Sequence, residues 1–367
     1  MSIKNIRIVL AILCALSLGY CGSTNNAAVD STTTCSPKLV GGASTLCALS
    51  LAGRVTTVAG SGIGGSADGT GTSASFTVVT DVTTDGTNLY VVDSGNHRIR
   101  KIALATGLVT TLAGAGLGNA DGVGTAATFN NPTGITTDGT NLYVADWLNH
   151  RIRKIVIATR GVTTLAGSSS GSADGIGTSA TFNQPNNLTT DGTNLYVTTG
   201  DHKIRKIVIA TAVVTTLAGS SVGSADGIGA AATFNNPLGI TTDGANLYVV
   251  EPNNQRVRRI VIGTGVVTTL AGNAFGYADG VGSAAAFSNP SGITTDGTHL
   301  YISDTQNYRI RKLNISTRTV TTLVGSSQGY ANGIGTAARF DNPWGLTTDG
   351  VKLYLADSSN LRIREIN

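Results

Sequence analysis

Charged and aromatic residues are both scarce in this chain of 367 residues, at 13% and 5%. The low charge excludes a disordered polyelectrolyte, because 41% hydrophobic residues are enough to build a core. Met occurs once and Pro seven times, whereas Gly, with 48 copies, is abundant together with Thr, Val and Asn. This composition disfavours a helical protein and favours short strands joined by tight turns.

The excess of basic over acidic residues is small. The 25 Lys and Arg against 21 Asp and Glu give a formal net charge of +4, and two of the basic residues, Lys4 and Arg7, lie near the N-terminus. A chain this close to neutral lacks the basic surface that nucleic-acid binding requires, so no nucleic-acid partner is expected. Beyond the N-terminal segment there is no apolar run of about 18 residues, and no further transmembrane helix is predicted.

The first 20 residues have the pattern of an export signal. A basic start is followed by an apolar run at 8–18 that is too short to span a bilayer. The sequence Leu18-Gly19-Tyr20-Cys21 resembles the cleavage site of bacterial lipoproteins, in which the Cys is lipidated and becomes the first mature residue. Tyr20 departs from that pattern, which has Gly, Ala or Ser there. Ordinary signal cleavage and an uncleaved segment are the alternatives.

These features divide the chain into a signal at 1–20, a polar tether at 21–47 and a folded domain at 48–367. A lipid on Cys21 would be the only contact with a membrane, the outer one in a cell with two membranes. Without the lipid, the protein would be periplasmic or secreted. Cys35 and Cys47 remain as a pair in an exported chain, where they either form a disulfide or stay free thiols.

One unit of about 53 residues repeats along the domain. The string Val-Thr-Thr, followed by Leu or Val, starts at Val55, Val109, Val162, Val214, Val267 and Val320. Each unit holds four short β-rich runs separated by turn signals, and an Asp-Gly pair marks a hairpin turn between the first two runs. Four antiparallel strands repeated around an axis describe the blade of a β-propeller.

The phase of the repeat predicts how the ring closes. The chain ends at 362–367 in the third strand of the last unit, whereas residues 55–60 form a fourth strand without a unit of their own. Pairing these two segments leaves no open edge. The sequence therefore predicts an all-β fold, a six-bladed β-propeller of four-stranded antiparallel blades, closed by an N-terminal strand that completes the last blade.

Three segments of the second unit carry a family signature: Asn131-Pro-Thr-Gly-Ile135, Tyr143-Val-Ala-Asp146 and Asn149-His-Arg-Ile-Arg153. They resemble the NHL repeat, named for its Asn-His-Leu type motif, and the resemblance extends over residues 55–367. It implies a six-bladed propeller but no single function, because family members include binding modules, sensor ectodomains and metal-dependent enzymes. RNA binding, known for some members, is disfavoured by the predicted export and the near-neutral charge.

Most residues that could carry chemistry recur in nearly every unit and are interpreted as structural, because a catalytic group is needed only once. An acid precedes the loop between the second and third strands and a base follows five residues later, as in Asp146 and Arg151, which predicts an ion pair across the loop. The Ala-Asp-Gly-x-Gly loops would offer calcium one carboxylate each, so they are interpreted as turns. No cofactor is expected from these motifs.

The candidate binding residues are those that break the repeat. In a propeller, the loop between the second and third strands and the connection between units lie on one face, so unique residues there form a candidate surface for a protein or a small ligand. These residues are Asp81, His97, Trp147, His150, Asn187, His202, Phe275, Tyr277, Tyr308, Tyr330 and Trp344. Neutral drift on exposed loops is the alternative.

Three of these residues, His97, His150 and His202, occupy the same loop position in consecutive units. Three imidazoles suit zinc. The resemblance therefore keeps a metal-dependent lyase or hydrolase at the mouth of the propeller as an alternative to a binding or scaffold module. A His at this position is also common in the NHL repeat itself, and neighbouring blades hold the rings apart.

Overall fold

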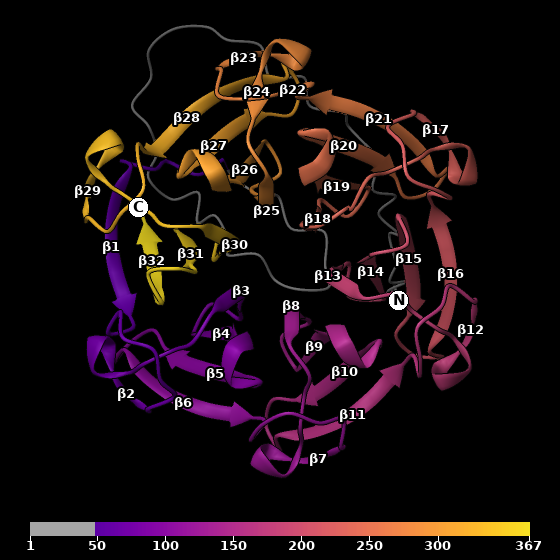
Figure 1. Ribbon diagram of the computed structural model, residues 1–367, viewed down its shortest axis with the longest axis vertical. Coiled ribbons are helices and arrows are strands. Elements are labelled where there is room, and N and C mark those ends of the chain that lie inside the picture. The colour runs from indigo at the N-terminus through magenta and orange to yellow at the C-terminus, as the bar shows by residue number, and fades with distance from the viewer. Residues whose placement is uncertain (1–47) are drawn as a thin grey trace, which may run out of the picture. The chain divides into compact units, whose positions relative to one another are not determined.

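The computed structural model describes residues 48–367, which form six β-sheets arranged around a central axis (Figure 1). The predictions that fall on residues 1–47 lie outside the described residues: the export signal, the lipid on Cys21, and the pair of Cys35 and Cys47. Within residues 48–367 no helix is both long and apolar enough to cross a membrane.

Each blade is one antiparallel sheet whose strands follow one another from the axis outward, with a short strand added at the outer edge. Blade 1 contains β3 (Val79–Thr84), β4 (Asn88–Asp93), β5 (Arg98–Ala103), β6 (Leu108–Ala113) and outer β2 (Gly69–Thr70). Blade 2 contains β8 (Pro132–Thr137), β9 (Asn141–Asp146), β10 (Arg151–Val156), β11 (Gly161–Ala166) and outer β7 (Gly122–Val123). Blade 3 contains β13 (Pro185–Thr190), β14 (Asn194–Thr199), β15 (Lys203–Val208), β16 (Val213–Ala218) and outer β12 (Gly175–Ile176).

The second half of the ring has the same organisation. Blade 4 contains β18 (Ile240–Thr242), β19 (Asn246–Glu251), β20 (Arg256–Val261), β21 (Val266–Ala271) and outer β17 (Gly227–Ile228). Blade 5 contains β25 (Pro290–Thr295), β26 (His299–Asp304), β27 (Arg309–Asn314), β28 (Thr319–Gly325) and outer β23 (Gly280–Val281). Blade 6 contains β30 (Pro343–Thr348), β31 (Leu353–Asp357), β32 (Arg362–Ile366), β1 (Arg54–Ala59) and outer β29 (Gly333–Ile334).

Short 3-10 turns and one small sheet complete the described elements. After the outer strands come η1 (Gly71–Ser73), η3 (Gly124–Ala126), η5 (Gly177–Ser179), η6 (Gly229–Ala231), η8 (Gly282–Ala284) and η10 (Gly335–Ala337). After the second strand of a blade come η2 (Ser94–Asn96), η4 (Trp147–Asn149), η7 (Pro252–Asn254) and η9 (Thr305–Asn307). The strands β22 (Ala274–Phe275) and β24 (Ala286–Phe287) pair in parallel.

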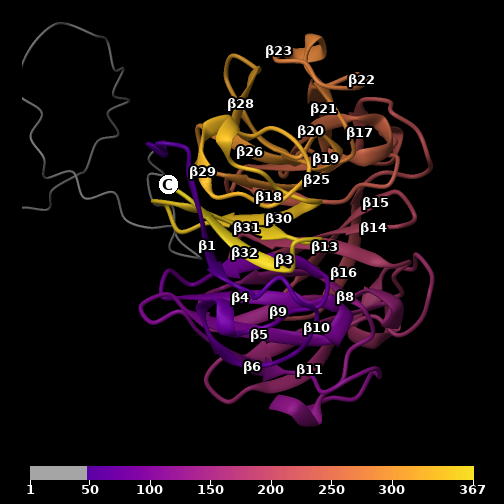
Figure 2. The same cartoon turned by 60° about the vertical axis from the view of Figure 1, so that its left-hand side comes forward.

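The predicted closure of the ring is confirmed. Strand β1 pairs antiparallel with β32, with Val55 opposite Ile366, and the two ends of the domain lie side by side (Figures 1 and 2). The Arg54 N–H donates to the Asn367 carbonyl at 3.1 Å, and the Asn367 N–H donates back at 3.0 Å. The N-terminal strand thus completes blade 6, as an all-β six-bladed propeller closed by its own N-terminus requires.

The outer strand of each blade comes from the Ala-Asp-Gly-x-Gly connection. In blade 2, Gly122 lies opposite Val162 of β11, so the connection from blade 1 pairs with the far edge of blade 2 before it enters β8. Every connection therefore crosses the whole width of the next blade. A two-residue strand with a Gly leaves little free edge for another chain to join.

The hydrophobic core lies between neighbouring blades. Between blades 1 and 2, Tyr90 and Ile99 pack with Phe129, Leu142 and their buried neighbours. Equivalent clusters fill the other interfaces, for example between blades 4 and 5. The blades are therefore stabilised by contact with one another, as in other repeat proteins.

The prediction that Asp146 pairs with Arg151 is wrong, because Asp146 pairs with a different arginine. Asp146 lies opposite Arg151 in the strand register, but its carboxylate accepts a hydrogen bond from Arg153 Nη1 at 2.7 Å. Arg153 is fully buried, also pairs with Asp121 at 2.7 Å, and stacks its guanidinium 5.1 Å from the centre of the Phe129 ring. The acid turns inward beneath the loop, where Arg153 and the amide of Asn149 donate to it, and Arg151 donates to the Asn119 carbonyl at the surface.

Candidate functional site

A cavity of about 240 Å³ lies at the mouth of the central channel. Its wall contains the second residue of the innermost run of each blade, namely Thr80, Thr133, Asn186, Leu238, Ser291 and Trp344. It also contains residues from the loops and from the next position along the strands, namely Val78, Ser94, Asn131, Trp147, Asn187 and Gly345. Since none of these described lining residues is charged, the cavity suits an uncharged molecule.

The pairing of the strands explains why these residues meet. Pro132 at the start of β8 lies opposite Asp146 at the end of β9, so the innermost strand begins at the face where the following loop carries Trp147. That loop contacts the connection between blades, because Asn149 Nδ2 donates to the Gly118 carbonyl at 2.7 Å. The two kinds of loop therefore share one face in this structure.

The candidate residues predicted from the sequence divide into two groups. Trp147, Asn187 and Trp344 line the cavity, and Asp81 lies directly behind Asn187 in the channel. Thr80, Ser94 and Val78 were missed, because a hydroxyl residue or a valine is unremarkable in a chain rich in both. The other seven predicted residues do not line the cavity.

Hydrogen bonds around the mouth satisfy most of its polar side chains. Thr133 Oγ1 donates to the Asn186 carbonyl at 2.6 Å, and Asn186 Nδ2 donates to the Pro237 carbonyl at 3.0 Å, so each side chain serves the next blade. Thr80 breaks this rule. Its Oγ1 is buried and has no partner within residues 48–367. A buried hydroxyl without a partner is costly, and Thr80 is the residue of blade 1 that lines the cavity at this position.

Val78 adds backbone strain to the same wall. It has a φ of +56°, which is unfavourable for a β-branched residue, and its side chain is 46% exposed. The equivalent positions in blades 2 to 6 hold residues that tolerate this conformation better: Asn131, Gln184, Asn236, Asn289 and Asn342. Such strain is concentrated at ligand sites, so its position here supports the assignment of the cavity.

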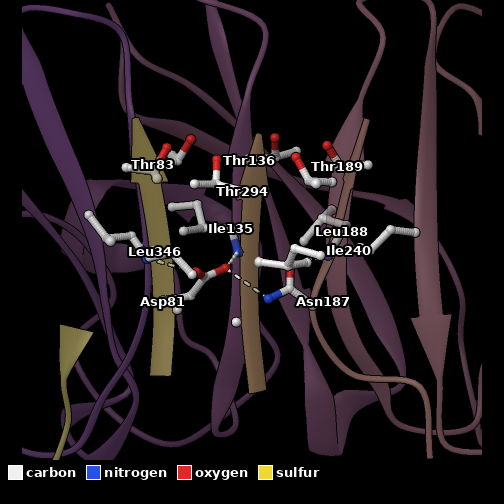
Figure 3. A pocket seen from close by; sticks show the side chains of 16 residues that line it. Asp81, Thr83, Ile135, Thr136, Asn187, Leu188, Thr189, Ile240, Thr294 and Leu346 are labelled. Carbon is white, nitrogen blue, oxygen red and sulfur yellow. Dashed lines mark hydrogen bonds between the residues drawn. The ribbon is translucent and has the colours of Figure 1, made fainter. Parts of the chain in front are cut away.

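The floor of the cavity is a hydrogen bond across the channel. Asn187 Nδ2 donates to Asp81 Oδ2 at 3.1 Å, and the same oxygen accepts the Ile135 N–H at 2.9 Å (Figure 3). Burial raises the pKa of Asp81 to about 7, although the N–H groups of Ile135 and Val82 and the amide of Asn187 oppose the shift.

The three predicted histidines each serve the adjacent blade. His97 Nδ1 accepts the Asn131 N–H at 3.1 Å, His150 accepts from Gln184 at 3.2 Å, and His202 accepts from Asn236 at 3.2 Å. Gln255 accepts the Asn289 N–H in the same way at 2.7 Å. Across residues 48–367 no three His, Cys, Asp or Glu side chains are grouped as metal ligands, so the geometry does not favour the zinc alternative.

The remaining aromatic candidates lie elsewhere. The guanidinium carbon of Arg309 lies 4.1 Å from the centre of the Tyr277 ring, and that of Arg362 lies 3.9 Å from the centre of the Tyr330 ring. Phe275 is 70% exposed in β22, and Tyr308 begins the turn into β27 with a φ of +56°. None of these four residues lines the cavity.

The comparisons with known proteins agree with the fold. No family model matches the chain. NHL repeat-containing protein 2 of Homo sapiens is 28% identical, over 78% of this chain and 45% of that protein. The same protein of Gallus gallus is 30% identical, over 77% of this chain and 45% of its own length. The chain thus spans less than half the length of these curated relatives.

Solved structures share the fold at lower identity. An auxiliary nutrient binding protein from Bacteroides thetaiotaomicron has a TM-score of 0.66 and 18% identity, covering 86% of this chain and 76% of that one. A virginiamycin B lyase from Staphylococcus aureus has a TM-score of 0.51 and 18% identity, covering 79% and 80%. The chain is an NHL-type six-bladed β-propeller. It is similar in sequence to NHL repeat-containing proteins and shares its fold with bacterial propellers of Bacteroides.

Proposed function

We propose that this protein is a binding module of the bacterial cell envelope that holds a small, uncharged and partly apolar molecule in the mouth cavity. The observation that carries the proposal is the lining. Trp147, Trp344 and Leu238 offer apolar surface, none of the described lining residues is charged, and hydroxyl and amide side chains complete the wall. A few polar groups in an apolar cavity are typical of small-molecule sites.

The distribution of the polar groups narrows the chemistry of the ligand. Polar groups come from several blades, as in Thr80, Asn186 and Ser291, and the apolar side chains of Trp147, Leu238 and Trp344 alternate with them around the mouth. The ligand would therefore combine hydroxyl or carbonyl groups with apolar surface. An ionised ligand is disfavoured here, because a buried charge without a counter-charge is costly. The neighbour from Bacteroides thetaiotaomicron is an auxiliary nutrient binding protein, and the likeness of fold supports a binding role here.

Export and anchoring through Cys21 are part of the proposal, and the N-terminal sequence pattern supports them. The lipid would leave the propeller free in the envelope with its mouth open to small solutes. Mass spectrometry of the purified mature protein should find a diacylated Cys21 at the N-terminus, and Cys21→Ala should abolish partition into detergent. An unmodified mature N-terminus elsewhere would refute the anchor and leave the binding proposal untouched.

The binding proposal is tested by a thermal-shift screen of uncharged metabolites, followed by calorimetry of the compounds that stabilise the protein. Trp147→Ala and Trp344→Ala should each weaken the binding of such a compound by roughly 1–3 kcal/mol, because large aromatic side chains contribute most of the binding energy at sites of this kind.

The matched control is Val351→Ala, a 66% exposed residue in the turn between β30 and β31, on the opposite face. It should change nothing. His299 on that face is a poorer control, because it contacts Asp296, which also accepts the Leu49 N–H at 2.9 Å. Compounds that bind both tryptophan variants as tightly as the wild type would show that the mouth is not the site.

A further inference from the structure

The innermost strands turn one backbone N–H of each blade toward the axis. In blade 4, the Leu238 N–H donates to the Val250 carbonyl and the Val250 N–H donates to the Gly239 carbonyl, so two residues of one strand face one residue of the other. The next pair, Ile240 opposite Val249, is then a pair without mutual hydrogen bonds, and the Ile240 N–H points away from β19 into the channel.

In blades 1 to 3 the chain supplies acceptors for these inward N–H groups. The Val82 N–H donates to Asp81 Oδ1 at 2.9 Å and the Ile135 N–H to Asp81 Oδ2 at 2.9 Å. The Leu188 N–H donates to Asn187 Oδ1 at 2.6 Å. One carboxylate and one amide oxygen therefore satisfy half of the ring.

In blades 4 to 6 the equivalent positions hold Gly239, Gly292 and Gly345, which have no side chain to offer. A Cβ at Gly292 would collide with the Trp344 carbonyl oxygen, and one at Gly345 would collide with the Asp81 carboxylate. The close approach of the strands thus requires glycine. The N–H groups of Ile240, Ile293 and Leu346 consequently face the channel without an acceptor from their own strand.

These groups line a chamber of about 50 Å³, together with Asp81, Asn187 and the inner strands of the other blades. The residues that follow them along the strands add a girdle of hydroxyls, including Thr83, Thr136, Thr189 and Thr294 (Figure 3). Among the described residues that line the chamber, Asp81 is the one titratable group. Val92 of β4 lies opposite it in the sheet, and no charged neighbour contributes to its pKa.

We propose that the N–H groups of Ile240, Ile293 and Leu346 bind a small carboxylate, of the size of formate or acetate, in this chamber. The molecule contains its own precedent, because the symmetry-related N–H groups of blades 1 and 2 already bind the two oxygens of Asp81. Converging backbone N–H groups are a common way to hold an anion without a basic side chain. This site is independent of the uncharged ligand proposed for the mouth.

The bound carboxylate shares the chamber with Asp81, and two carboxylates so close do not both stay ionised. Binding is therefore coupled to uptake of one proton by Asp81. Since burial already raises the pKa of Asp81 to about 7, the proton is present before binding at pH 6 and must be acquired at pH 8. Affinity for the anion falls as the pH rises through this range.

The test uses formate as the probe and the backbone amide signals of Ile240, Ile293 and Leu346 in NMR spectra as the readout. Formate should shift these three signals at pH 6, and its affinity should be about tenfold lower at pH 8, from the protonated fraction of a group with a pKa of about 7. Calorimetry in two buffers of different ionisation enthalpy should show uptake of close to one proton per formate at pH 8. Formamide, the uncharged analogue, should not bind.

Asp81→Asn removes the charge and keeps an acceptor oxygen, so the variant should bind formate equally well at both pH values. Absence of the three shifts in wild-type protein at pH 6 would overturn the proposal. A wild-type affinity independent of pH would overturn the role of Asp81, and equal binding of formamide would show a water site and no anion site. These wild-type measurements decide the matter even if Asp81→Asn fails to fold.

Discussion

The outer three strands of every blade are nearly interchangeable, whereas the innermost strands differ at the mouth of the channel. In the outer region, Tyr143, Arg153 and their equivalents are buried in all six blades between neighbouring sheets. At the mouth, the same backbone position holds Thr80, Asn186 or Trp344. The same residue type is therefore kept in every blade where the side chain packs against the next blade, and it varies where the side chain faces the axis.

The innermost strand itself shows both behaviours. Its mouth end varies from blade to blade, but three and four residues further on every blade has Thr, as in Thr136 and Thr137. The hydroxyl of the second Thr holds the following turn, since Thr137 Oγ1 donates to the Asn141 carbonyl at 2.9 Å. The variable positions hold no turn, and although Thr133 and Asn186 bond to the next blade, different residue types are accepted there.

The largest expected effect comes from opening the ring. A chain that begins at Ser61 lacks β1, which leaves β32 and β29 with unpaired edges. We expect loss of cooperative unfolding or insolubility, measured by circular dichroism against temperature and by sedimentation. The control begins at Ala48 and retains β1. A truncated chain with an unchanged melting temperature would show that closure of the ring does not contribute to the stability of the propeller.

A smaller effect is expected at the buried pair of an acid and an arginine, which blade 3 lacks. Arg153→Met leaves Asp146 buried without its partner and should cost about 3–5 kcal/mol of unfolding free energy. Blade 3 has Thr199 in place of that acid, and its Arg205 pairs with Asp174, which is 49% exposed. Arg205→Met should therefore be milder by at least about 1 kcal/mol in urea denaturation.

A double variant separates charge from packing. Asp146→Asn added to Arg153→Met removes the unpaired charge and should recover part of the loss. Equal costs for Arg153→Met and Arg205→Met would mean that the buried acid is unimportant and that the stacking on the phenylalanine carries the interaction.

The smallest expected effect is a gain. Val78→Asn places at a φ of +56° the residue type that most other blades use, and should stabilise the protein by about 1 kcal/mol in the same denaturation assay. The substitution should also lower the affinity for any ligand of the mouth cavity, because an apolar part of the wall is lost. A variant that is more stable and binds undiminished would show that the strain at Val78 has no part in recognition.

Much of this fold is predictable from the repeat, because its period and phase specify the blades and the closing strand. The outer strands were not predicted, since Gly122 and Val123 within a glycine-rich connection do not have a strand pattern. The ion-pair partner was missed by two residues, because spacing across a loop does not tell which arginine is buried. At the mouth, the breaks in the repeat identified Trp147, Asn187 and Trp344, but not the unpartnered hydroxyl of Thr80.

The histidines show that a loop residue can have a structural role that the sequence does not reveal. Their shared loop position suggested a metal site, and in the structure the Nδ1 atom of each ring accepts an N–H group from the next blade. Gln255 at the same position was the available signal, because a glutamine shares with histidine the ability to accept such a bond and seldom ligates zinc.

The offset between repeat unit and blade has a consequence for how such a chain evolves. Strand β1 supplies the missing strand to the last unit of the chain. The pairing that closes the ring therefore does not depend on how many units lie between the two ends. Gain or loss of one whole unit by duplication or deletion would leave this pairing intact. The inner strands already touch at the hub, where a Cβ on Gly239 or Gly292 would meet the backbone of the strand beside it, so loss of a unit would crowd this region further.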